Sequence, residues 1–267
     1  MVFSMSYTQS LMRLDNFYTF TAENIFIDTL ALDSMASQGG LQISGIRYIV
    51  RIHVSLFIQA GVFFAAAGTV SIPRAWLFFG MGIIYYPVST AIVYWKNLQL
   101  INQRGESKQD TKSWDRILAP LYFFIGYFLI AAVIGMDVGR YTWTSLSSYY
   151  ILPGIMLYVG GGILNTWAMV INPHFESTVR IQKERDHAVV STGPYHSIRH
   201  PGYCAGIAWT LSIPLIIGSL LGFIPAIIGI FVLLFRTYLE DETLQRELPG
   251  YTEYTKKVTD RIVPHIW

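Results

Sequence analysis

Charge is scarce in this sequence. Charged residues make up 13% of the 267 residues, about half the share of roughly 25% that is typical of soluble proteins. The formal net charge is +2, which is too small to argue for nucleic-acid binding. Hydrophobic residues make up 52%, and the mean hydropathy is +0.40. The composition therefore predicts an integral membrane protein.

Cysteine is almost absent as well. The single cysteine, Cys204, excludes an intrachain disulfide and any zinc site built from cysteines. It lies at the start of an apolar segment, where a free cysteine usually behaves as a small hydrophobic residue. We expect it to be a packing residue, not a nucleophile.

Several sequence motifs of soluble enzymes are missing. The chain has no Gly-x-Gly-x-x-Gly fingerprint, no phosphate loop and no Gly-x-Ser-x-Gly elbow. His196 and His200 are four residues apart, but Pro201 follows at once and interrupts a helix there. We therefore expect no metal site and no serine nucleophile.

The first 45 residues are mixed and polar, without an apolar core after a basic start, so they do not read as a secretory signal peptide. We expect residues 1–45 to be an N-terminal extension and residues 46–267 to be the membrane domain.

Four apolar stretches in that domain have about the 20 residues that a spanning helix needs. Gly160, Gly161 and Gly162 lie within the fourth and would permit close helix packing. The predicted spans are Tyr48–Ile72, Ala75–Trp95, Ile117–Val138 and Tyr150–Ile171.

A fifth apolar stretch, Tyr203–Tyr238, is too long for one crossing and short for two. Proline and glycine interrupt it in the middle, so a tight helical hairpin is predicted. The charged tail, Leu239–Trp267, carries Tyr251, Tyr254, Val258 and Ile262 on one helical face, which predicts a surface helix. The expected fold is an all-α, polytopic transmembrane helical bundle.

Lysine and arginine are concentrated in Lys96–Arg116, in Asn172–His200 and in the tail, whereas the loops after the first and third spans hold Arg74 and Arg140. The positive-inside rule then predicts that both termini and the polar stretches face the cytoplasm.

Two polar stretches adjoin the apolar runs, namely Glu184–Tyr203 and Arg236–Glu242. Ionisable groups at the edge of a hydrocarbon layer are costly and mark functional sites by default. Arg236 and Glu240 are four residues apart on one helical face, so they form either an ion pair or two walls of a shared cavity. Of the three consecutive acids that begin at Glu240, we expect only one to point inward. A plain loop, with Arg199 and His200 touching lipid headgroups, is the alternative reading.

The ordered pattern of these residues resembles the isoprenylcysteine carboxyl methyltransferase family. It consists of His187-Ala188-Val189-Val190, Gly193-Pro194-Tyr195, Arg199-His200-Pro201-x-Tyr203 and Arg236-x-x-x-Glu240, and the tail from Leu248 to Pro264 resembles the family's closing segment. The resemblance covers about Ile181–Trp267.

This resemblance implies an integral membrane enzyme that uses S-adenosylmethionine, with residues 181–267 as its cofactor-binding part. Arg236 would face the substrate as the catalytic residue, and Gln182, or alternatively Arg180, would add a polar cofactor contact upstream. The remaining implied cofactor-binding residues are His187, Ala188, Val189, Val190, Tyr195, His200, Pro201, Gly202, Tyr203 and Glu240.

The acceptor is less well defined than the donor. A carboxylate, such as a prenylcysteine-type C-terminus, is already ionised near pH 7 and needs no general base, whereas a thiol or a lipid amine needs one, for which His187 or His200 could serve. A hydrophobic acceptor would enter from the bilayer. A nicotinamide-dependent sterol-type reductase on the same scaffold and a non-catalytic lipid-binding protein are the alternatives, and the oligomeric state stays open.

Overall fold

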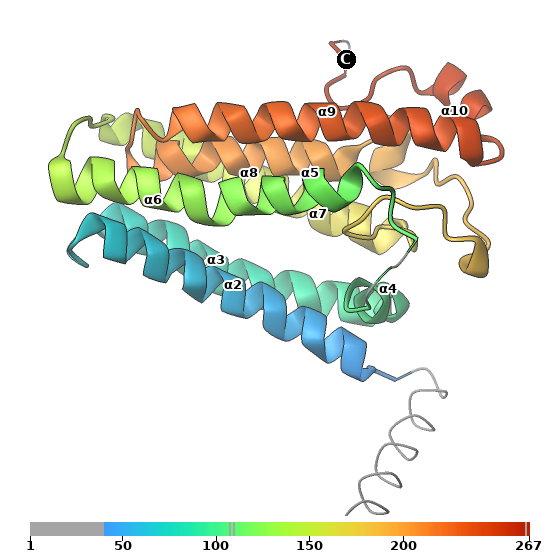
Figure 1. Ribbon diagram of the computed structural model, residues 1–267, viewed down its shortest axis with the longest axis horizontal. Coiled ribbons are helices and arrows are strands. Elements are labelled where there is room, and N and C mark those ends of the chain that lie inside the picture. The colour runs from blue at the N-terminus through green and yellow to red at the C-terminus, as the bar shows by residue number, and fades with distance from the viewer. Residues whose placement is uncertain (1–39, 107, 109, 265) are drawn as a thin grey trace, which may run out of the picture. The chain divides into compact units, whose positions relative to one another are not determined.

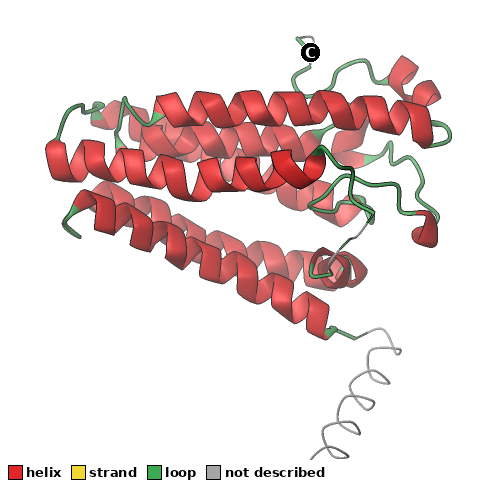
Figure 2. Cartoon of the chain, in the orientation of Figure 1, coloured by secondary structure: helices red, strands yellow, loops and turns green. Residues whose placement is uncertain are grey.

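The computed structural model describes residues 40–106, 108, 110–264 and 266–267 (Figure 1). Every regular element of this described part is helical, as Figure 2 shows, so the predicted all-α class is confirmed. The chain divides into two compact units at Ile43, and the description that follows concerns Ser44–Trp267. Most of the predicted extension, residues 1–45, lies outside the described residues.

Five helical segments of the described chain are long and apolar enough to cross a membrane, which together with the composition makes this an integral, multi-pass membrane protein. They are α2 (Ile43–Ala67), α3 (Pro73–Lys96), the continuous segment Asp115–Tyr141, the segment Ser148–Ile171, which contains α7 (Ile151–Ile171), and α9 (Phe223–Glu247).

The predicted bounds of the first span were wrong by about five residues at each end. Helix α2 stops at Ala67 because Gly68 adopts φ +70°, a left-handed conformation that ends helices. Arg140 then caps the end, since its guanidinium donates to the carbonyls of Ala65 (2.9 Å) and Ala66 (2.8 Å).

The third span is a single helix with two π-helical segments. Its parts are α5 (Asp115–Phe124), η1 (Ile125–Leu129), α6 (Ile130–Gly135) and η2 (Met136–Tyr141). A π-helical turn disturbs the regular hydrogen-bond ladder, and here the buried amide of Gln59 on α2 donates to the carbonyl of Gly126 at 3.0 Å. The contact ties α2 to the third span in the middle of the bundle.

The predicted hairpin is confirmed. It consists of α8 (Pro201–Ile217) and α9, which lie in the upper part of Figure 1, and α8 packs against both α9 and α7. Helix α9 continues well past the apolar stretch to Glu247, so both Arg236 and Glu240 lie on it.

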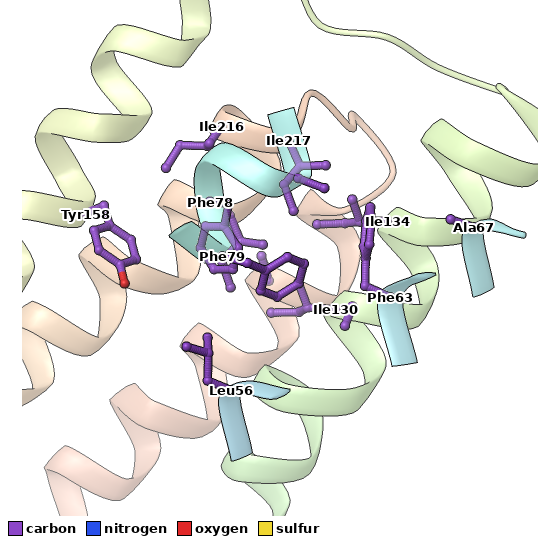
Figure 3. Close-up of a cluster of buried hydrophobic side chains, with 14 of the residues drawn as sticks. Leu56, Phe63, Ala67, Phe78, Phe79, Ile130, Ile134, Tyr158, Ile216 and Ile217 are labelled. Carbon is purple, nitrogen blue, oxygen red and sulfur yellow. The ribbon is translucent and has the colours of Figure 1, made fainter. Parts of the chain in front are cut away.

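Buried side chains from all five spanning segments and from α8 form the core shown in Figure 3, including Phe63, Phe79 and Ile134. Two of the three consecutive glycines permit close packing as predicted. A Cβ on Gly161 would lie 3.1 Å from the carbonyl oxygen of Ala205 on α8, and one on Gly162 would lie 2.8 Å from a ring carbon of Tyr85 on α3, whereas Gly160 has no such neighbour within 4 Å.

Short helices occupy segments that the sequence left as loop or surface. Helix α4 (Leu98–Arg104) lies within the predicted loop Lys96–Arg116. Helix α10 (Tyr251–Lys257) confirms a helix in the tail, but it is only seven residues long. Of the predicted face, Tyr251 and Tyr254 lie on α10, whereas Val258 and Ile262 follow it. All four side chains are buried, so the tail packs onto the site instead of lying free on a surface.

Candidate active site

One cavity of about 1020 Å³ lies where the two polar stretches meet. All twelve sequence-predicted site residues line it, together with the alternative Arg180. They are Gln182, His187, Ala188, Val189, Val190, Tyr195, His200, Pro201, Gly202, Tyr203, Arg236 and Glu240. The volume is at the upper end of the 300–1,000 Å³ that is usual for ligand pockets, so the cavity has room for more than one small molecule.

Asp241 is the centre of the polar packing beside this cavity. It is fully buried, and the guanidinium of Arg199 donates to its two carboxylate oxygens at 2.8 and 3.0 Å. Arg261 from the tail donates at 2.9 Å, and the hydroxyl of Tyr251 donates at 2.9 Å. One carboxylate therefore joins α9, the loop before α8 and the tail.

His200 is oriented by the same carboxylate. Its Nε2 lies 3.1 Å from Oδ1 of Asp241, and a carboxylate only accepts, so Nε2 is the donor. The backbone N–H groups of Arg199 and His200 donate to the carbonyls of Asp260 (3.0 Å) and Arg261 (2.8 Å). Arg199 and His200 are only 7% and 6% exposed, so the reading that they touch lipid headgroups was wrong.

Glu240 and Asp241 differ in burial and in the groups that they contact. Asp241 is the acid of this run that is fully buried, whereas Glu240 is half-buried, lines the cavity and accepts from the hydroxyl of Tyr203. The expectation of a single inward-pointing acid was therefore wrong, because two of the three contribute.

Arg236 is held by an acid from another span. Its Nε and Nη2 donate to the carboxylate of Asp115 at 2.6 and 3.1 Å, and Nη2 also donates to the carbonyl of Ser177 at 2.8 Å. The guanidinium carbon lies 5.3 Å from the ring centre of Tyr203, within cation–π range. The ion pair of Arg236 is thus with Asp115 at the start of α5, and both Arg236 and Glu240 line the shared cavity.

Gln182 and His187 lie in a hydrogen-bonded loop with His174. Gln182 is 2% exposed; its amide donates to the carbonyl of His174 at 2.9 Å, and its backbone N–H lies 3.4 Å from Nδ1 of His187. Burial, with further contributions from His174 and Arg180, lowers the pKa of His187 to about 4. The ring is therefore neutral at pH 7, and with Nδ1 as acceptor its proton lies on Nε2.

Arg180, the alternative to Gln182, is committed to ion pairs. Its guanidinium contacts Glu176 at 2.7 Å, Asp110 at 2.9 Å and Glu184 at 2.5 Å. Three carboxylates around one buried guanidinium connect the segment after α4 to the loop before α8.

The remaining predicted residues shape the cavity wall. Tyr195 is buried, and its hydroxyl accepts from the amide of Asn172 at 3.0 Å. Gly202 permits a close approach, since a Cβ there would lie 2.4 Å from the ring of Phe175, which also lines the cavity. A side chain at position 202 would displace that ring.

The cavity continues between the spanning helices. There it is lined by apolar and aromatic side chains of α2, α3 and the third span, including Leu56, Phe78, Val93, Phe123 and Tyr127. A polar region near the membrane edge and an apolar region between the helices are thus parts of one cavity.

Sequence reasoning missed Asp115 and Asp241. Asp115 was placed in a loop, and Asp241 was counted with a solvated run. One signal was available in the sequence. Arg199 and Arg236 adjoin apolar runs, and a guanidinium in such a position needs a carboxylate partner.

Comparisons with known proteins agree with the motif-based resemblance. Residues 149–249 match the phospholipid methyltransferase family model. A protein-S-isoprenylcysteine O-methyltransferase of Saccharomyces cerevisiae (strain ATCC 204508 / S288c) is 30% identical over 117 residues, which are 43% of this chain and 48% of that protein. The chain thus matches about half the length of this relative. Both matches are to methyltransferases, so the predicted resemblance is confirmed for the C-terminal part of the chain.

Proposed function

We propose that the protein transfers a methyl group from S-adenosylmethionine to a hydrophobic acceptor, and that the accepting group is a carboxylate of the prenylcysteine type. The observation that carries the proposal is the single cavity, which joins the polar groups of His200, Arg236 and Glu240 to an apolar region between the spans. A polar methyl donor and a hydrophobic acceptor can meet only in a cavity that has both a polar and an apolar region.

S-adenosylmethionine, when bound, supplies an electrophilic methyl group on a positively charged sulfur, and the protein has to align it with the nucleophile. The sulfonium charge is partly lost in the transition state, so a carboxylate directly at the sulfur would favour the ground state and slow the reaction. Glu240 is therefore assigned to the ribose hydroxyls or the ammonium group. Neutral His187 adds no repulsive charge to this cationic ligand.

Arg236 is assigned to the acceptor carboxylate. Asp115 occupies its Nε and Nη2, which leaves Nη1 for a further acceptor. A carboxylate near pH 7 is ionised and attacks without a general base, so this role requires positioning alone. The Lys- and Arg-rich loops adjoin the site, and the positive-inside rule puts it and both termini on the cytoplasmic side.

Binding of S-adenosylmethionine tests the donor assignment. Calorimetry on the detergent-purified full chain should give micromolar affinity, with loss of binding in Glu240→Gln and His200→Ala. Glu242→Gln is the matched control, because Glu242 pairs with exposed Arg246. Well-folded wild-type protein that binds no S-adenosylmethionine would exclude the proposed activity.

Asp115→Asn tests the acceptor role of Arg236. Without its charged partner the guanidinium loses its fixed orientation, so KM for the acceptor should rise about ten-fold or more while the affinity for S-adenosylmethionine stays within two-fold. An equal rise in KM for the acceptor and loss of affinity for S-adenosylmethionine would indicate that Asp115 has a structural role only.

The family match favours a second acceptor, a lipid amine, because the matching model is that of phospholipid methyltransferases. Labelled-methyl transfer into a total membrane extract separates the two. Base-labile label in protein or peptide indicates a carboxyl ester, whereas base-stable label in the lipid fraction indicates nitrogen.

A further inference from the structure

A second basic region lines the same cavity and contains none of the predicted site residues. It consists of Arg51 on α2 and Arg104 at the C-terminal end of α4, and both side chains line the cavity. These two helices are neighbours in Figure 1, and Nη2 of Arg51 donates to the carbonyl oxygen of Arg104 at 2.7 Å. We call this pair the Arg51–Arg104 region.

The two guanidinium groups are held against one aromatic ring. Their central carbons lie 5.9 Å (Arg51) and 5.1 Å (Arg104) from the ring centre of Tyr48, which is 7% exposed. Nη1 of Arg104 donates to the carbonyl of Phe175 at 2.8 Å. These contacts fix the positions of two positive charges without neutralising them.

The charges in this region are not compensated within the described residues. Neither arginine is part of an ion pair there, whereas the nearby Lys108 contacts Glu106 at 2.6 Å and Glu176 at 3.7 Å. Moreover, Nε of Arg104 is buried, and among the described residues it has no hydrogen-bond partner. A buried donor without an acceptor is unfavourable, and more so when it belongs to a charged group.

We propose that the Arg51–Arg104 region binds the phosphate of a phospholipid headgroup. The planar fork of arginine matches phosphate oxygens, and two arginines can share one phosphodiester. The lipid source is favoured because Val50, Val54 and Phe57 on α2, around Arg51, are 53%, 46% and 63% exposed on a membrane-spanning helix. Lipid phosphates lie at the level where such a helix meets water. This site goes beyond the proposed methyl transfer, whose groups lie on α8, α9 and the loop before α8.

Retention of a short-chain anionic lipid tests the proposal. Full-length protein in detergent is titrated with dihexanoyl phosphatidylglycerol and analysed by native mass spectrometry, with dihexanoylglycerol, which has no phosphate, as the comparison ligand. The variants are Arg51→Gln and Arg104→Gln, and Arg47→Gln is the matched control, since Arg47 is an exposed arginine one turn earlier on α2 that does not line the cavity. Inorganic phosphate is titrated separately.

The expected result is a loss of phosphatidylglycerol affinity of about ten-fold in Arg51→Gln and in Arg104→Gln, no change in Arg47→Gln, and weak binding of dihexanoylglycerol that no variant alters. Arg51 is exposed, so its variant decides the matter should Arg104→Gln fail to fold. Equal affinity in all four proteins, or binding of inorganic phosphate without binding of the lipid, would overturn the proposal. Because no S-adenosylmethionine is present, this result is independent of the methyl-transfer test.

Discussion

Asp241 offers the sharpest test of how the site is built. In Asp241→Asn the side chain keeps its size but loses its charge, and Arg199, with a side chain only 5% exposed, loses the carboxylate that it contacts through two nitrogens. Removing one partner of a buried ion pair costs about 3–5 kcal/mol. One kcal/mol shifts the melting temperature of a domain of this size by about 2–4 °C, so a decrease of roughly 6–20 °C is expected.

Cys204 allows the melting temperature to be measured by thiol labelling. It is the single cysteine and lies half-buried on α8 beside the site, so a thiol-reactive fluorophore reports unfolding of the detergent-purified chain. The matched control is Glu242→Gln. Glu242 pairs with Arg246, whose side chain is 71% exposed, and an exposed pair of this spacing contributes about 0.3–0.5 kcal/mol. A change of less than 2 °C in Asp241→Asn, or an equal change in both variants, would refute the central role of Asp241.

Two further predictions concern the cavity wall. Gly202→Ala should destabilise by about 1–3 kcal/mol, because the added methyl group would displace the ring of Phe175, whereas Gly160→Ala, with no neighbour within 4 Å, should not lower the melting temperature. The pKa of His187 is about 4 in the folded chain and about 6.5 in an unfolded one, so the unfolded state binds the extra proton between these values. The contribution of His187 to the stability of the folded state is complete above pH 6.5 and decreases as the pH falls towards 4. His187→Asn should therefore reduce the difference between the melting temperatures at pH 7.5 and pH 5. The same difference in the wild-type protein and in the variant would contradict the assignment.

The sequence alone predicted most of the fold because hydropathy is a property of local segments. The predicted spans Ala75–Trp95 and Tyr150–Ile171 agree with α3 and α7 to within about two residues. The first span deviated because Gly68 and a distant arginine determine where α2 ends, and neither effect is visible in a hydropathy pattern. The π-helical segments in the third span likewise depend on packing.

The site was predictable where spacing along one helix sufficed and not where partners come from distant segments. Arg236 and Glu240 follow from a separation of four residues. The pairing of Arg236 with Asp115 crosses 121 positions, and no local pattern indicates it. Which of two adjacent acids is buried depends on the contacts of α9 with the tail, which a single sequence does not reveal.

Helix α9 turns about 100° from one residue to the next. The neighbouring carboxylates of Glu240 and Asp241 therefore point in different directions and contact different groups. Under the proposed function, position 240 can be altered to suit a different ligand while the contacts of Asp241 with Arg199, His200 and Arg261 stay in place. The proposed ligand contact can thus change by point substitution without destabilising the scaffold, whereas shifting the register of α9 by a single residue would remove both the ligand contact and the scaffold contact.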